Sequence, residues 1–145
     1  MNHKAKGTSA ERELIHKFWA TNTWTACRVA GSGGMRYPCP DIFAATTNRL
    51  LAIECKSTGD DRQYITKDQI EDLKTYAARS GAEAWIGVRF TGGAWYFFSL
   101  EDLKETPTLF GVTQKEAEQK GLSFNELVGV FEGEEKPILE SECPE

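Results

Sequence analysis

The sequence predicts an α/β fold, with one domain of about five strands and two main helices. One domain is expected because 145 residues, 40% apolar and 27% charged, can bury a core without disulfides or metals. Apolar residues at helical spacing alternate with short aromatic and β-branched runs, which are typical of strands. No repeat or second domain is visible in the sequence. We therefore expect a single domain over residues 1–131, followed by a Glu-rich, disordered tail over 132–145.

Four helices are predicted from capping boxes, in which Ser or Thr is followed three residues later by Glu or Gln. The first two boxes begin the main helices, expected over residues 9–20 and 66–80, and Gly81 should end the second. The last two boxes begin short helices. The four pairs are Thr8 with Glu11, Thr66 with Gln69, Thr113 with Glu116, and Ser123 with Glu126.

Five strands are predicted from aromatic and β-branched runs that end at turn residues. The second and third should form a hairpin around Thr47 and Asn48, and the polar stretch 57–63 after it should be a loop. The glycine-rich stretch 31–34 is expected to be mobile, and it lacks the lysine of a nucleotide-binding P-loop. The strands are expected over 24–30, 41–46, 49–56, 84–90 and 94–100.

Two acids and a lysine should converge on this hairpin. If it turns symmetrically about residues 47 and 48, cross-strand partners have numbers that sum to 95, so Asp41 faces Glu54. Lys56 lies two residues further along and shares their face, whereas Cys55 points to the other. Two carboxylates beside a lysine suit Mg²⁺ and phosphodiester hydrolysis. A structural Lys56 salt bridge at a sheet edge remains the alternative, because the D-x(12)-E-x-K pattern is short and degenerate.

Two further residues are candidates for the same site. Glu11 shares the inward face of the first helix, where it could be a metal ligand, bind a metal-bound water or only complete the capping box. Arg28 could grip a phosphate with two hydrogen bonds, or it could be a surface arginine of a strand.

Charge and cysteine content restrict the class of protein. The net charge is −5, but residues 1–90 carry 13 basic and 10 acidic side chains, so a nucleic-acid partner stays possible. The start of the chain has no hydrophobic signal region and no apolar run reaches membrane-spanning length, which predicts a cytoplasmic protein. The four cysteines have no C-x-x-C spacing, so we expect free thiols and no structural zinc site.

Four sequence blocks resemble the archaeal Holliday junction resolvases, a branch of the PD-(D/E)xK nuclease superfamily. They agree with that family in order and spacing from residue 6 to about residue 100. The resemblance implies a restriction-endonuclease-like fold, in which a mixed sheet is flanked by helices. It identifies residues 1–131 as a nuclease domain. The blocks are KGTSAERELI at 6–15, R-x-AGSGG at 28–34, PDI at 40–42 and ECK at 54–56.

The resemblance also implies roles for individual residues. Metal-binding and catalytic acids would be Glu11, Asp41 and Glu54, with Lys56 as the catalytic lysine. Ser32 matches a serine of the family's mobile loop, with a catalytic or DNA-binding role. The loop here is longer than the shortest family versions, and no role is transferred beyond residue 103. The DNA-binding set would be Lys6, Arg12, Arg28 and Ser32.

The implied activity is resolution of four-way DNA junctions by paired symmetric nicks, with one or two Mg²⁺ ions per site and Mn²⁺ as a substitute. A homodimer is implied, to which the strand at 94–100 could contribute, although its aromatic residues are equally suited to a sheet core. The protein would work at the nucleoid. Two other functions stay open: a restriction or repair nuclease of the same superfamily, and an inactive module that binds branched DNA. For the C-terminal segment, an inert extension is the default and a protein partner the alternative.

Overall fold

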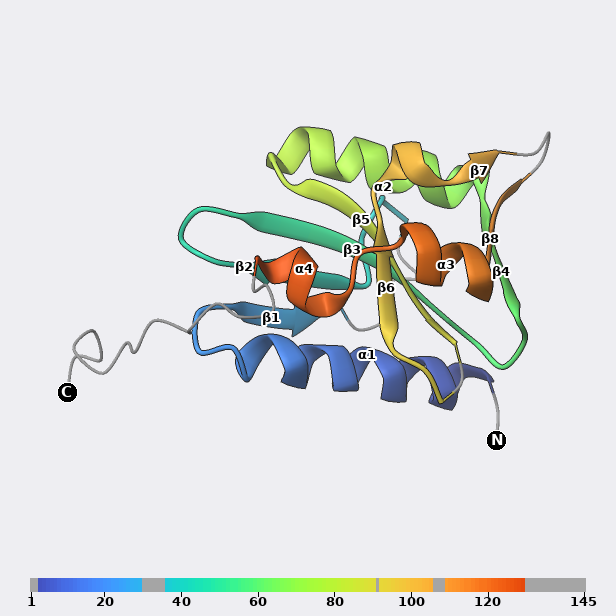
Figure 1. Ribbon diagram of the computed structural model, residues 1–145. Helices are drawn as coiled ribbons and strands as arrows, with labels where there is room; N and C mark the ends of the chain where they lie inside the picture. The colour runs from blue at the N-terminus through green and yellow to red at the C-terminus, as the bar shows by residue number, and fades with distance from the viewer. Residues whose placement is uncertain (1–2, 30–35, 91, 106–108, 130–145) are drawn as a thin grey trace.

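The computed structural model describes residues 3–29, 36–90, 92–105 and 109–129. Its centre is a five-stranded sheet between helices (Figure 1). The helices are α1 (His3–Trp19), α2 (Lys67–Ser80), α3 (Gln114–Lys120) and α4 (Phe124–Val128), with a 3-10 turn η2 (Leu100–Asp102). The strands are β1 (Thr25–Arg28), β2 (Ile42–Ala45), β3 (Leu50–Thr58), β4 (Arg62–Thr66), β5 (Glu83–Phe90), β6 (Trp95–Phe98), β7 (Lys104–Glu105) and β8 (Leu109–Thr113).

The central sheet is mixed, as predicted. Its strand order is β1-β2-β3-β5-β6, and α2 makes the crossover between the parallel pair β3 and β5. The other neighbours in this sheet are antiparallel. The hairpin has the predicted register, because Ile42 pairs with Ile53 and Ala45 with Leu50, so that partner numbers sum to 95.

A second sheet, with the order β4-β8-β7, was missed by the sequence analysis. The predicted loop over 57–63 is confirmed only over 59–61, because β3 continues to Thr58 and β4 begins at Arg62. The partner of β4 is β8, more than 40 residues away, with Ile65 opposite Phe110. Ile65 is buried in that pairing, which stabilises the extended conformation of the polar residues in β4.

Three of the four predicted helix starts are confirmed. The side chain of Thr66 accepts a hydrogen bond from the Gln69 backbone N–H at 3.2 Å, and Gly81 ends α2 with φ 75°. The two short helices begin after Thr113 and Ser123 as expected. The predicted start of α1 at residue 9 was wrong, since α1 begins at His3.

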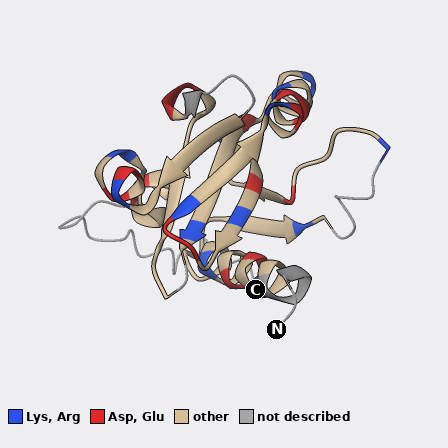
Figure 2. Cartoon of the chain, turned by 90° about the vertical axis from the view of Figure 1, so that its right-hand side faces the viewer, with Lys and Arg blue, Asp and Glu red and all other residues tan. Residues whose placement is uncertain are grey.

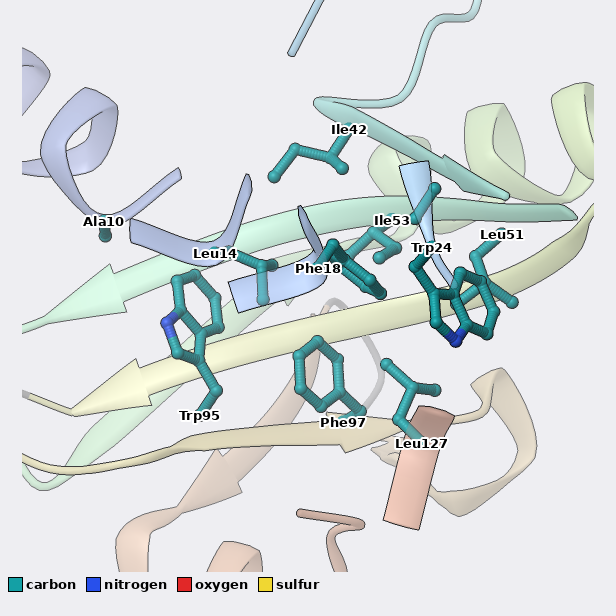
Figure 3. Packing of buried hydrophobic residues seen from close by; sticks show 11 residues of the cluster. Ala10, Leu14, Phe18, Trp24, Ile42, Leu51, Ile53, Trp95, Phe97 and Leu127 are labelled. Atoms are coloured by element: carbon teal, nitrogen blue, oxygen red, sulfur yellow. The ribbon is translucent and has the colours of Figure 1, made fainter. Parts of the chain in front are cut away.

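Two clusters of buried side chains form the core, one on each face of the sheet. α1 and α4 cover one face, and Figure 3 shows Leu14 and Phe18 of α1 together with Trp95 and Phe97 of β6. α2 and α3 cover the other face. The aromatic rings of β6 therefore pack inside this chain, which supports the sheet-core alternative for residues 94–100. No helix in the described part of the chain is long and apolar enough to cross a membrane.

Gly121→Ala is expected to destabilise the fold by about 1–3 kcal/mol, through overpacking. A Cβ at Gly121 would lie 2.8 Å from the Ala117 carbonyl oxygen and 2.9 Å from the Tyr96 Cβ, and backbone cannot move aside cheaply. Gly7→Ala is the matched control, because no atom lies within 4 Å of its added Cβ. Inside a helix this control should stabilise by about 0.5–1 kcal/mol. Chemical denaturation of both variants measures the difference, and equal midpoints would contradict it.

Candidate active site

Asp41 is held in place at the start of β2 by its neighbours on both sides. Its backbone N–H donates to the Ile53 carbonyl at 3.1 Å, and its own carbonyl accepts from the Val29 N–H at 2.8 Å. Its carboxylate accepts a hydrogen bond from the Cys55 N–H at 2.8 Å, which directs the side chain toward β3. The β1–β2–β3 ladder thus fixes both the position and the orientation of this acid.

Glu54 lies against Asp41, as the hairpin register predicts. The pKa of Glu54 rises to about 8, first because the carboxyl is buried, then because of the negative charge of Asp41. A hydrogen bond with the Asp41 side chain raises it further, while the positive charge of Lys56 lowers it. Two carboxylates this close resist simultaneous ionisation, so Glu54 keeps its proton near neutral pH unless a cation binds.

Glu11 of α1 forms an ion pair with Arg28 of β1. The Arg28 Nε lies 2.7 Å from Glu11 Oε2, and the two side chains are 28% and 15% exposed. Arg28 also donates to the Thr8 hydroxyl at 3.3 Å. Both members of the supposed capping box therefore bind Arg28, and Glu11 serves as its ion-pair partner inside the longer α1.

Burial raises the pKa of Glu11, against the hydrogen bond from Arg28 that lowers it. The charge of Asp41 raises it as well, and Glu11 in turn raises the pKa of Glu54. The three acids thus influence one another electrostatically, although they come from α1, the start of β2 and β3.

The donor set of this site fits a hard divalent cation through two carboxylates. Within the described ranges, no three or more His, Cys, Asp or Glu side chains come close enough together to hold a metal ion. Mg²⁺ commonly uses one or two carboxylates and completes its shell with water and substrate phosphate. The crowding of Asp41 and Glu54 would be relieved by such an ion, whereas Glu11 is already engaged by Arg28.

For the remaining predicted site residues, the structure shows fewer contacts with Asp41 and Glu54. Lys56 acts electrostatically on Glu54, and Arg12 lies exposed on α1. The backbone of Lys6 lies in α1, but its side chain is outside the described part, as is the whole of Ser32. Cys55 packs against the α1-side core, on the face opposite Glu54, as predicted. The described cysteines, Cys27, Cys39 and Cys55, are free thiols, also as predicted.

A second ion pair to α1 was missed by the sequence analysis. Arg89 of β5 lies 3.2 Å from Glu13, so the helix is tied both to β1 through Arg28 and to β5. The signal was present as the one basic residue in the apolar run AWIGVRF. Figure 2 shows basic segments on neighbouring strands of the central sheet, beside acidic ones. These pairs anchor α1, and with it Glu11, over the sheet.

The chain matches the family model described as archaeal Holliday junction resolvase (Hjc) over residues 2–136. It belongs to that family. The crossover junction endodeoxyribonuclease Hjc of Archaeoglobus fulgidus is 37% identical over 128 residues, which are 88% of this chain and 93% of that protein. Hjc of Sulfolobus acidocaldarius is 30% identical over 143 residues, covering 97% of this chain and 99% of the relative.

A solved structure supports the same assignment. The 1.6 Å structure of A. fulgidus Hjc, described as a Holliday junction resolvase from an archaeal hyperthermophile, aligns with a TM-score of 0.78 at 36% identity. The alignment covers 87% of this chain and 98% of that one. The resemblance to the family and the restriction-endonuclease-like α/β fold are both confirmed.

Proposed function

We propose that this chain cuts four-way DNA junctions by paired symmetric nicks, through metal-dependent phosphodiester hydrolysis. Membership of the Hjc family supports the substrate class. The observation that carries the chemistry is the close Asp41–Glu54 pair beside Lys56, where burial first and then the charge of Asp41 raise the pKa of Glu54 to about 8. Such a pair is costly for the fold and is explained by a cation that binds between the carboxylates.

Asp41 and Glu54 would hold the metal, with Mg²⁺ as the first choice, Mn²⁺ as a substitute and one or two ions per site. A bound divalent ion supplies charge neutralisation on the phosphate and lowers the pKa of the attacking water. Glu11 would be a third ligand or would accept a hydrogen bond from a metal-bound water. Its pairing with Arg28 favours the second role. Lys56 would orient the nucleophilic water.

The DNA backbone would be seated by basic side chains. Arg28 already lies next to Glu11, so one guanidinium can fix the acid and face a phosphate. Arg12, exposed on α1, would make a further phosphate contact. Lys6 and Ser32 complete the proposed DNA-binding set, with Ser32 also proposed at the catalytic loop.

A homodimer would place two such sites on the two opposed strands of a junction, because an isologous pair matches the twofold symmetry of the branch. The protein would then work in the cytoplasm at the nucleoid. For residues 132–145, which include the acidic tail, an inert extension stays our proposal and a protein partner the alternative.

Strand nicking on an end-labelled four-way junction and on a linear duplex of the same sequence tests this function. We expect symmetric nicks confined to the junction, with Mg²⁺ and not with EDTA. Equal cutting of the duplex would instead favour a general nuclease of the superfamily. Tight junction binding without cutting under any divalent metal would leave a binding module.

A further inference from the structure

Tyr37 is the most exposed of the large apolar side chains in the described part of the chain. Its exposure is 69%, against 54% for Trp19 and 47% for Tyr64. The guanidinium carbon of Arg36 lies 5.7 Å from the centre of the Tyr37 ring, in cation–π range. The segment before β2 therefore presents a flat aromatic ring and a positive charge to solvent.

The other two exposed aromatic residues are accounted for by contacts within the chain. The Trp19 Nε1 donates to the Ala26 carbonyl at 3.0 Å, which fixes the end of α1 against β1. The Tyr64 hydroxyl accepts from Arg62 at 3.2 Å, and its ring covers Gly111, whose added Cβ would lie 3.4 Å from it. Tyr37, by contrast, contacts the neighbouring Arg36, a contact that leaves most of its ring open to solvent.

Tyr37 is also tethered close to the proposed reaction centre. It precedes Asp41 by four residues, and Pro40 between them is buried. Four residues span at most about 14 Å, so the ring cannot lie far from the acid that the β-ladder fixes. A DNA strand advances roughly 3.4 Å per nucleotide, which places the Tyr37 Cα within about four nucleotides of a phosphate at Asp41.

We propose that Tyr37 stacks on a nucleobase at the branch point of the junction, with Arg36 supporting the ring by its positive charge. This inference rests on the proposed function and adds to it a residue that selects the substrate. Bases beside a point of strand exchange can lose a stacking neighbour, so an aromatic ring can take that place without breaking a continuous stack. In an intact duplex the same contact would first require unstacking, which costs free energy. The contact therefore favours branched DNA over linear DNA.

The test compares equilibrium binding of the wild type and Tyr37→Ala to a four-way junction and to a linear duplex, both in EDTA. We expect Tyr37→Ala to weaken junction binding roughly 5- to 150-fold, the range for loss of one base–aromatic stack. Duplex binding should be unchanged, so junction selectivity falls by the same factor. Tyr37→Phe should bind as the wild type does, because stacking needs the ring and not the hydroxyl.

Tyr64→Ala is the matched control, since it removes an exposed tyrosine that also touches an arginine, Arg62. Arg62 lies near the negative charges of Asp61 and Glu116. It should leave junction binding unchanged. The dependence of log Kd on log salt should keep its slope in Tyr37→Ala, because stacking releases no counterions, whereas loss of a phosphate contact lowers the slope by about one.

Three results would overturn the stacking role: unchanged junction binding in Tyr37→Ala, an equal loss on duplex, or an equal loss in Tyr64→Ala. These outcomes are separate from failure of the proposed function, which the wild type reports by itself. A wild type that resolves junctions normally, together with an unaffected Tyr37→Ala, would reject the stacking contact alone.

Discussion

Asp41→Asn is expected to abolish junction cleavage, with a loss of at least about 1,000-fold in rate, while junction binding is kept. Asparagine lacks the negative charge that a divalent ion requires, yet its side-chain oxygen can still accept the hydrogen bond from the Cys55 N–H. The hairpin should therefore keep its geometry. Single-turnover cleavage with saturating protein, together with Kd measured in EDTA, separates the two effects.

Asp60→Asn is the control for the same change of charge, because Asp60 lies exposed in the β3–β4 connection. It should cut at the rate of the wild type. Asp41→Asn should also be no less stable than the wild type to thermal unfolding at pH 9, since it removes a negative charge beside Glu54. If Asp41→Asn still nicks the junction, Asp41 is not a metal ligand. If Asp41→Asn unfolds, the loss of cleavage is explained by the loss of structure.

The hairpin and the capped helices could be predicted because their determinants are local. Strand residues alternate between two faces, so one assumption about the turn at residues 47 and 48 placed Asp41 opposite Glu54. The box of Thr66 and Gln69 satisfies its own backbone groups, which makes the start of α2 readable from four residues.

The missed features depend on contacts between residues far apart in the sequence. The spacing of Thr8 and Glu11 is that of a capping box, but Arg28 lies 17 to 20 residues away and takes both side chains. The polar residues of β4 adopt strand structure because β8 pairs with them. Nothing in residues 57–66 indicates that β8 is the partner. The tie between Arg89 and Glu13 likewise spans 76 residues.

The size of the pKa shift of Glu54 could not be predicted from the sequence either. Register predicts that two acids face each other, but the pKa depends first on how deeply Glu54 is buried and then on the charge of Asp41. That pKa of about 8 has a direct consequence for metal binding. If Mg²⁺ binds between Asp41 and Glu54, as proposed, it must displace the proton of Glu54, so pH should control the affinity for the metal.

We expect Mg²⁺ affinity for the DNA-free protein to rise as pH increases from 6 to 8, by up to about tenfold per pH unit, and to level off above the Glu54 pKa. Calorimetric titration at several pH values measures this. At pH 7 close to one proton should be released per ion bound, which buffers of different ionisation enthalpy would reveal. Glu54→Gln should bind Mg²⁺ weakly at every pH and release no proton. An affinity that is independent of pH in the wild type would contradict the proposal that Mg²⁺ displaces the proton of Glu54.

The same group also contributes to the way in which stability without metal depends on pH. Glu54 keeps its proton up to a pKa of about 8 in the folded chain, whereas its ordinary value is 4.5. The folded state therefore binds more protons between these values, and the stability contributed by Glu54 is full below pH 4.5 and lost as pH rises through 8. Under the proposal Mg²⁺ would bind the ionised form of Glu54, so it should raise the thermal midpoint more at pH 9 than at pH 6. Glu54→Gln should remove this difference, because the proposed metal affinity and the pH dependence of stability would then both depend on this one carboxyl group.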